Sequence, residues 1–204
     1  MILILYLVLM VLAVFMSAYL TRHYIFTLTA LYHQRRPPHP TPHDMVYQPK
    51  VSVLIPARDE EKVIGRVLQR MTELTYPREK LEVIVIDDAS TDRTSEIAEE
   101  FAKKFEYIKV VHRKPEEGGK GKPAALNHGL KYSVGEIIYC FDADYHPWRD
   151  ILEKLTIYFA DPKVGAVQGR VTVLNESDTL VTKLVALERI GGYRVDQLAR
   201  DNLE

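Results

Sequence analysis

The sequence has very little cysteine: Cys140 is the one such residue among 204. A lone thiol excludes an internal disulfide framework and any zinc site built from several cysteines, and it fits a reducing compartment. Because Cys140 lies inside an apolar run, we expect it to be buried and unreactive. Internal repeats and low-complexity tracts are also missing, so the composition is that of an ordinary folded α/β protein with one medium domain and an appendage.

Neither sign of charge is in excess, because 27 lysine and arginine residues stand against 28 aspartate and glutamate residues. Proteins that bind nucleic acid usually concentrate basic side chains on one surface, where they neutralise phosphates. This composition offers no such concentration. We therefore expect no nucleic-acid partner.

Charge is absent altogether from the first 20 residues, which are almost wholly apolar. About 20 apolar residues span the hydrocarbon core of a bilayer as a helix. The alternative, a cleaved signal peptide, would have a basic segment before a shorter apolar stretch and a cleavage site of small residues after it. Here nothing basic precedes the run and Thr21-Arg22-His23-Tyr24 follows it, which favours a retained anchor.

The orientation of this anchor follows from the basic residues beside it. Arg22, Arg35 and Arg36 all lie on its C-terminal side, so the positive-inside rule places the body of the protein in the cytoplasm, at the cell membrane. Residues 24–32 either continue the helix or lie along the membrane surface. We thus expect a transmembrane helix and juxtamembrane segment at 1–32, a proline-rich linker at 33–49 and a domain at 50–204.

Strands and helices alternate through that domain. Short apolar runs predict strands at 51–55, 81–86, 107–111, 137–141 and 164–167. Helical spacing predicts helices at 63–71, 97–105 (capped by Thr91 or Asp92), 122–132 and 151–159, and a mostly helical stretch at 177–203 interrupted by Gly191-Gly192. This alternation predicts a Rossmann-like open, mostly parallel sheet with helices on both faces. Ligands bind such sheets beyond the carboxyl ends of the strands, where the strand order reverses.

Acidic residues follow three of the predicted strands. They stand in Arg58-Asp59-Glu60, in Asp87-Asp88 and in Asp142-Ala143-Asp144. Such a concentration of like charge is costly unless cations or hydrogen-bond donors offset it. We expect Asp92 to cap a helix instead, and Asp59 and Glu61 have the same explanation open to them in the first turn of a helix.

The pair Asp142 and Asp144 is the strongest candidate for a metal site. If the backbone stays extended, two residues separated by one point to the same side. Hard carboxylate oxygens suit Mg²⁺ or Mn²⁺, which commonly takes one or two carboxylates together with phosphate oxygens and water. Such a cation would neutralise charge on a diphosphate leaving group.

The glycine-rich stretch Gly118-Gly119-Lys120-Gly121-Lys122-Pro123 does not match a known phosphate loop. It lacks the glycine spacing and the Ser or Thr of the Walker motif, and no G-x-G-x-x-G follows the first strand. Lys120 or Lys122 at the start of a helix is suited to a phosphate, while a solvated loop is the alternative.

Four segments in this order resemble glycosyltransferase family 2, and in particular the membrane-bound processive polysaccharide synthases for cellulose, hyaluronan and poly-N-acetylglucosamine. They are Val51-Ser52-Val53-Leu54-Ile55-Pro56-Ala57-Arg58-Asp59-Glu60, Val85-Ile86-Asp87-Asp88-Ala89-Ser90-Thr91-Asp92, Gly121-Lys122-Pro123-Ala124-Ala125-Leu126-Asn127 and Phe141-Asp142-Ala143-Asp144. The resemblance implies a GT-A fold and an inverting, metal-dependent transfer of sugar from a UDP-sugar to a polysaccharide or lipid-linked acceptor.

The resemblance also implies roles for individual residues. Asp144 would bind the metal directly, and Asp142 would lie near the ribose or the sugar. Glu60 and Asp88 would lie near the uracil and ribose. The other donor-binding residues implied are Pro56, Ala57, Arg58, Lys122, Asn127 and Gln168.

The sequence departs from these synthases at its end. Their catalytic base, in a T-E-D or similar motif, and their Q-x-x-R-W motif lie beyond the point that corresponds to Glu204. We therefore expect a truncated chain that binds the donor with little or no transfer. Two alternatives stay open: a non-catalytic, membrane-tethered nucleotide-sugar-binding protein and, less favoured, a nucleotidyltransferase.

Overall fold

The computed structural model describes residues 2–33, 47–175 and 178–193. By internal contacts the chain divides into two compact units, one of Pro42–Val167 and one of Met1–Thr41 with Gln168–Glu204. Each unit is described by itself. The domain boundaries expected from the sequence stay predictions.

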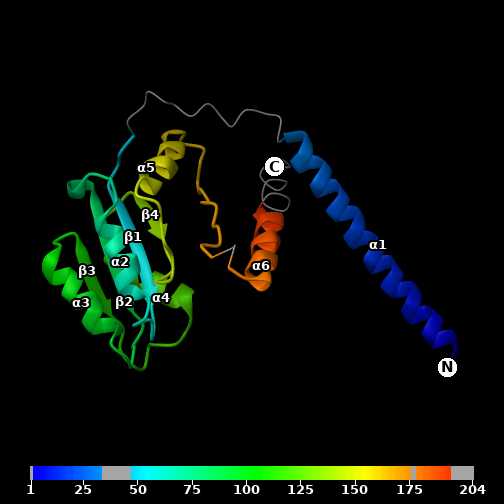
Figure 1. The fold of residues 1–204 in the computed structure, drawn as a ribbon, viewed down its shortest axis with the longest axis horizontal. Coiled ribbons are helices and arrows are strands. Elements are labelled where there is room, and N and C mark those ends of the chain that lie inside the picture. The colour runs from blue at the N-terminus through cyan, green and yellow to red at the C-terminus, as the bar shows by residue number, and fades with distance from the viewer. Residues whose placement is uncertain (1, 34–46, 176–177, 194–204) are drawn as a thin grey trace. The chain divides into compact units, whose positions relative to one another are not determined.

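The N-terminal apolar run forms one unbroken helix, α1 (Ile2–His33), as Figure 1 shows. Residues 24–32 therefore continue the helix. At about 1.5 Å per residue its 32 residues exceed the roughly 30 Å core of a bilayer. Among the described residues, α1 is the helix that has the length and composition to cross a membrane.

Four parallel strands form the sheet of the larger unit. They are β1 (Val51–Ala57), β2 (Leu81–Asp87), β3 (Ile108–His112) and β4 (Ile137–Cys140), in the order β3-β2-β1-β4. The pairs align Val51 with Leu81 and with Ile137, so β1 is central. The strand order reverses between β1 and β4, because the chain moves outward from β1 to β3 and then returns to the other side of β1.

Helices cover both faces of this sheet, which confirms the predicted architecture (Figure 1). On one face α2 (Ile64–Thr72), α3 (Thr94–Lys104) and α5 (Ile151–Thr156) pack on alternate strand residues such as Val53 and Val83. On the other face α4 (Lys122–Leu130) packs on Leu54, Ile84 and Ile86. Short 3₁₀ helices at Arg78–Lys80 and Ile157–Ala160 and the helix α6 (Leu180–Gly191) complete the regular structure.

Close packing holds α4 against the sheet. A Cβ atom on Gly129 would lie 2.6 Å from Cγ1 of Ile86, so only glycine permits this approach. The position of α4 matters because its first residues reach the carboxyl ends of the strands.

The structure corrects the prediction of a fifth strand at 164–167. These residues pair with no strand in the described part of the chain, and Gly165 and Ala166 are exposed. The run is short, and glycine and alanine add little of the side-chain packing that stabilises strands. The predicted helical stretch at 177–203 is confirmed in part, as α6 (Leu180–Gly191); residues 192 and 193 continue it as a π-helical turn, so the predicted interruption at Gly191-Gly192 does not occur, and residue 177 and residues 194–203 lie outside the described residues.

Cys140 is also corrected, because its side chain is exposed. Within the described sheet β4 is an edge strand that pairs only with β1. Ile137 and Tyr139 face the larger core, so Cys140 faces the opposite side, where α4 packs mainly on β1 and β2. An apolar run at a sheet edge thus leaves one face uncovered.

A buried carboxylate lies at the amino end of the sheet. Glu82 on β2 is 7% exposed, and its Oε1 accepts hydrogen bonds from Ser52 Oγ (2.6 Å) and the Val134 amide (3.1 Å). Its Oε2 accepts one from Lys109 Nζ at 2.7 Å. Desolvation acts to raise the pKa of Glu82, but the hydrogen bonds from Lys109 and Ser52 outweigh it and lower the pKa below its ordinary value. This acid is fully paired.

Candidate active site

A cavity of about 850 Å³ opens beyond the carboxyl ends of β1 and β4, at the position where the strand order reverses. It is the place that the architecture predicts for a ligand. The residues that line it come from the ends of β1, β2 and β4, from the glycine-rich loop and from the start of α4. They are Pro56, Ala57, Arg58, Glu60, Asp88, Gly118, Gly119, Gly121, Lys122, Ala125, Asp142, Ala143 and Asp144.

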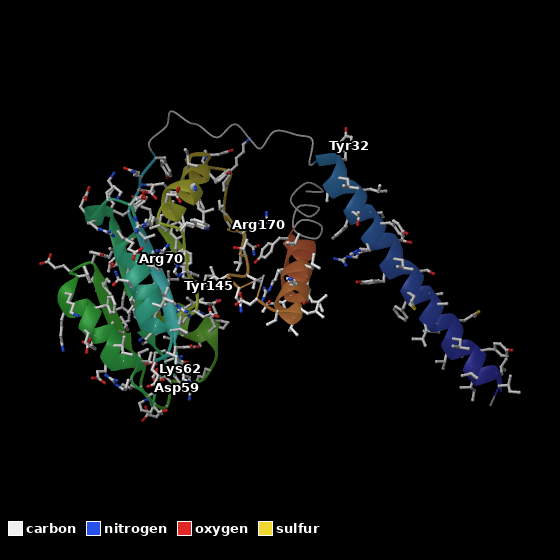
Figure 2. All side chains as sticks on the ribbon, in the orientation of Figure 1. Tyr32, Asp59, Lys62, Arg70, Tyr145 and Arg170 are labelled. Atoms are coloured by element: carbon white, nitrogen blue, oxygen red, sulfur yellow. The ribbon has the colours of Figure 1, made fainter. Side chains whose placement is uncertain are left out.

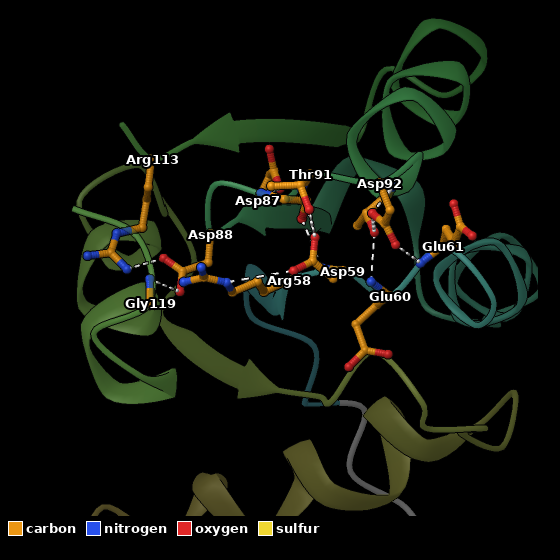
Figure 3. Close-up of polar contacts among 12 residues, drawn as sticks. Arg58, Asp59, Glu60, Glu61, Asp87, Asp88, Thr91, Asp92, Arg113 and Gly119 are labelled. Atoms are coloured by element: carbon orange, nitrogen blue, oxygen red, sulfur yellow. Dashed lines mark hydrogen bonds and ion pairs between the residues drawn. The ribbon is translucent and has the colours of Figure 1, made fainter. Parts of the chain in front are cut away.

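The loop after β1 is tied to the loop after β2. The Asp59 carboxylate accepts hydrogen bonds from the Thr91 amide (2.7 Å) and hydroxyl, and the Asp59 amide donates to Ser90 Oγ (Figure 3). Asp59 has a φ of 55°, a left-handed conformation that an aspartate adopts more readily than most residues. Figure 2 shows Asp59 and Lys62 next to each other at one end of the larger unit. This connection fixes the cavity wall that carries Arg58 and Glu60.

Asp59 and Glu61 therefore do not occupy the first turn of α2, which begins only at Ile64. Glu61 instead accepts a hydrogen bond from the Arg93 amide at 3.2 Å. The expectation for Asp92 is confirmed: its Oδ1 accepts from the amide of Thr94, the first residue of α3, at 2.9 Å, and its Oδ2 accepts from the Glu61 amide. Although desolvation opposes it, hydrogen bonding from Thr94 lowers the pKa of Asp92.

Asp88 connects the sheet to the glycine-rich loop. Its Oδ1 forms an ion pair with Arg113, and its Oδ2 accepts a hydrogen bond from the Gly119 amide at 3.0 Å (Figure 3). Arg113 also donates to the Glu117 carbonyl at 2.5 Å, and both charged side chains are buried. These contacts hold the loop against the end of β2, where it forms one wall of the cavity.

Gly119 has a backbone conformation that other residues adopt poorly. Its φ is +71°, and a Cβ atom there would lie 2.1 Å from Nη1 of Arg58. Gly118 is confined as well, because a Cβ atom would lie 2.7 Å from that of Ala89. The loop can lie this close to Arg58 and Asp88 because Gly118 and Gly119 have no side chains.

Lys122, the first residue of α4, forms an ion pair with Asp142 across the cavity. The hydrogen bond to Asp142 raises the pKa of Lys122 above its ordinary value. Both side chains remain partly exposed, at 48% for Lys122 and 36% for Asp142. The pair is thus within reach of any ligand in the cavity.

Asp142 and Asp144 both line the cavity, although the extended geometry expected of them does not persist. β4 ends at Cys140, and the Tyr145 amide donates to the Asp142 carbonyl at 3.1 Å, which closes a turn. Asp144 is exposed. Within the described part of the chain, the carboxylates of Asp144 and Glu60 accept no hydrogen bond and form no ion pair.

The side chains that line the cavity carry an excess of negative charge. Four carboxylates (Glu60, Asp88, Asp142 and Asp144) stand against two cations, Arg58 and Lys122. Buried Arg113 offsets Asp88 from outside the lining. An anionic ligand would meet repulsion here unless a cation came with it.

This donor set fits a divalent cation of the hard class. Mg²⁺ and Mn²⁺ take one or two carboxylates and complete their coordination with phosphate oxygens and water. Asp144, with Asp142 beside it, offers that number of oxygen ligands. No group of three or more His, Cys, Asp or Glu side chains placed to hold a metal occurs among the described residues.

Eight of the ten predicted site residues line one cavity. Asn127 does not: it is exposed on α4, more than a helical turn beyond Lys122. Gln168 belongs to the other unit. The functional roles assigned to all ten stay predictions.

Sequence reasoning missed Arg113, and it did not assign Gly118 and Gly119 to the site. Arg113 directly follows β3, and this position could have identified it. The prediction considered only acidic residues at strand ends. A basic residue at a strand end beside acidic ones is a candidate partner for them.

The fold and the cavity define a class: an α/β protein whose acidic cavity lies at the reversal of a parallel sheet, where nucleotides commonly bind. Comparison with known proteins gives the family. A family model described as "Glycosyl transferase family 2" matches residues 52–202. The chain belongs to this family, which confirms the resemblance drawn from the motifs.

Several curated relatives support this assignment. The chain is 45% identical over 148 residues to "Probable glycosyltransferase YdaM" of Bacillus subtilis, covering 70% of this chain and 34% of that protein. It is 38% identical over 135 residues to "Beta-monoglucosyldiacylglycerol synthase" of Synechocystis sp., covering 66% of this chain and 28% of that protein. The chain thus spans about a third of the length of these relatives.

A solved structure supports the fold. The mannosyltransferase PcManGT from Pyrobaculum calidifontis, solved in complex with GDP-Man and Mn²⁺, matches with a TM-score of 0.64 and 33% identity. The match covers 81% of this chain and 48% of that one. The predicted GT-A fold is confirmed.

Proposed function

We propose that this chain is the donor-binding part of a membrane-anchored, inverting glycosyltransferase that uses Mg²⁺ or Mn²⁺ to bind a UDP-sugar. The observation that carries the proposal is the cavity at the reversal of the sheet, with its excess of carboxylates and with Asp144, whose carboxylate has no partner among the described residues. These carboxylates would repel a diphosphate, and Asp144 with Asp142 would hold a divalent cation that offsets the charge of the diphosphate.

Each wall of the cavity has a separate part in binding. The segment Pro56–Glu60 and Asp88 surround the nucleoside, because they lie at the ends of the two central strands. Lys122 and the start of α4 face the diphosphate, where a helix N-terminus favours negative charge. Asp144 binds the metal, and Asp142 lies beside the metal and the ribose or sugar.

The chemistry that these residues support is the departure of a nucleoside diphosphate from the anomeric carbon. A bound divalent cation supplies electrostatic stabilisation of the leaving diphosphate. The residues of this chain orient the donor and fix the position of its phosphates before the reaction. We assign no catalytic base to this chain.

The acceptor is a polysaccharide or a lipid-linked molecule, in agreement with the names of relatives. One is a "Beta-monoglucosyldiacylglycerol synthase", and another, 36% identical over 95 residues, is a "Poly(ribitol-phosphate) beta-glucosyltransferase". Anchoring by α1 would keep the domain at the membrane surface, on the cytoplasmic side by the distribution of arginines.

A GDP-sugar is the second candidate donor, because PcManGT was solved with GDP-Man. Isothermal titration calorimetry of the full chain in detergent with UDP, GDP and UTP, each with and without Mn²⁺, separates the possibilities. We expect UDP to bind and to need Mn²⁺. Tighter binding of GDP would mean that the donor is a GDP-sugar. Tighter binding of UTP would favour a nucleotidyltransferase. Absence of nucleotide binding would refute the proposal. A non-catalytic binder would bind UDP and Mn²⁺ equally well, and it is separated by sugar-transfer assays on the protein with any sequence that follows residue 204.

A further inference from the structure

One contact in the cavity conflicts with the proposed use of Asp142. Its carboxylate already has a cation, because the Lys122 ammonium forms an ion pair with it. A divalent cation beside Asp142 and Asp144 would lie next to that ammonium. Two cations at one carboxylate repel each other strongly at such short range.

Lys122 also lies where it could contact a phosphate group bound in the same cavity. It is the first residue of α4, and Gly121, Lys122 and Ala125 together bring the start of this helix to the cavity wall. The positive end of the helix dipole lies there and attracts phosphate. Because a lysine side chain is flexible and its ammonium group is compact, the ammonium can move from a carboxylate to a phosphate beside it.

Both partners of the pair are accessible for such an exchange. Lys122 is 48% exposed and Asp142 is 36% exposed, so the bond is screened by solvent and inexpensive to break. By contrast, the buried ion pair of Asp88 with Arg113 leaves both side chains at most 8% exposed. The Lys122–Asp142 pair should therefore separate more readily than the Arg113–Asp88 pair.

We propose that Lys122 is a positioning residue that occupies Asp142 in place of the metal while the donor is absent, and transfers to the donor's diphosphate when metal and nucleotide bind. This inference rests on the proposed function. The exchange makes the two ligands interdependent: the diphosphate removes Lys122 from Asp142, and the vacated carboxylate then favours the metal. Metal binding without nucleotide is correspondingly weakened.

The test measures Mn²⁺ affinity of the full chain in detergent from the electron paramagnetic resonance signal of free Mn²⁺, with and without UDP. In Lys122→Met, which removes the charge but keeps the apolar stem, we expect Mn²⁺ alone to bind about twofold to fivefold more tightly than in wild type. In the same variant UDP should bind about tenfold more weakly in the presence of Mn²⁺. The improvement in Mn²⁺ affinity that UDP produces should therefore shrink.

Two control variants separate this role from a general effect of charge or folding. Lys122→Arg keeps the charge and should leave Mn²⁺ affinity without UDP near that of wild type. Lys120→Met removes a neighbouring exposed lysine that forms no ion pair in the described part of the chain, and it should change Mn²⁺ affinity less than Lys122→Met does. Circular dichroism of each variant checks that it is folded.

The outcomes distinguish this inference from the proposed function. If wild type binds UDP with Mn²⁺ but Lys122→Met binds Mn²⁺ alone no more tightly, the exchange is overturned while the proposed function stands. If Lys120→Met has the same effect as Lys122→Met, the effect is one of overall charge and the exchange is again overturned. If wild type binds no nucleotide, both fail.

Discussion

The two ends of the central sheet treat their carboxylates in opposite ways. At the amino end, Glu82 is buried and each of its oxygens accepts hydrogen bonds, from Ser52 and the Val134 amide on one side and Lys109 on the other. At the carboxyl end, Asp144 and Glu60 line an open cavity, and their carboxylates have no partner within the described residues.

The difference separates acids that stabilise the fold from acids that would be available to a ligand under the proposed function. A buried carboxylate must be paired, because an unpaired one would lose its hydration without compensation. A carboxylate left unpaired in a cavity adds nothing to stability, but it keeps a free coordination position for a cation. Substitutions at the two ends should therefore separate stability from binding.

The largest effect is expected from Asp144→Asn at the carboxyl end. Loss of a metal ligand should weaken Mn²⁺-dependent UDP binding by at least about 10–100-fold, with no loss of folding, because Asp144 is exposed. Titration calorimetry with a parallel urea unfolding curve measures both quantities. Glu136→Gln, an exposed acid just before β4 at the opposite end, serves as the matched control and should leave both unchanged.

The converse result is expected from Glu82→Gln at the amino end. The substitution removes the charge that Lys109 pairs with and mismatches a buried network, so we expect the free energy of unfolding to fall by about 1–3 kcal/mol. Urea unfolding followed by circular dichroism measures this loss, with exposed Glu79→Gln as control. UDP affinity of the folded variant should match wild type; a large loss of affinity would mean that the two ends are not separate.

Gly119→Ala should affect both quantities moderately. A φ of +71° costs a non-glycine residue about 1–2 kcal/mol, and the added Cβ would displace Arg58 at the cavity wall. We expect a loss of stability of that size and a several-fold loss of UDP affinity. Gly165→Ala, where a Cβ atom meets nothing within 4 Å, should change neither.

The smallest effect is a pH dependence at His112. Hydrogen bonding to Glu99 (2.9 Å) and, after it, to Asp87 (3.0 Å) raises the pKa of His112 above 6.5 in the folded state. A raised pKa stabilises the fold below the unfolded pKa, and this stability is lost as pH rises through the folded value. The ring also lies 3.4 Å from the uncharged hydroxyl oxygen of Ser95.

Urea unfolding of wild type and His112→Gln between about pH 6 and pH 8 measures the contribution of His112 to the free energy of unfolding. The advantage of wild type should be less than about 1 kcal/mol, because His112 is about half exposed, and it should decrease toward pH 8. An advantage that grows with pH would contradict the assigned direction.

Much of the candidate site was predictable from sequence, because parallel strands bring the segments that follow them to one edge of the sheet. The runs before Pro56, Asp87 and Asp142 each predicted a parallel strand, and parallel strands bring their carboxyl ends to one edge. The convergence of the three acidic clusters on one cavity followed from this rule alone.

The missed features depend on contacts that no local pattern contains. Arg113 reaches Asp88 across 25 positions in the sequence, and Cys140 is exposed because β4 is an edge strand in the described sheet. Both outcomes are decided by tertiary packing. The turn after β4 is a different case, because the Tyr145 amide donates to the Asp142 carbonyl only three positions earlier; it ends the extended geometry at Asp142 and still leaves both aspartates in the cavity.

Crystals grown with UDP and Mn²⁺ offer the most direct test, since manganese can be located by its anomalous scattering. We predict one manganese peak within about 2.2 Å of an Asp144 carboxylate oxygen, with phosphate oxygens on its other side. Manganese bound elsewhere, or UDP bound in this cavity with no metal at Asp144, would contradict the account.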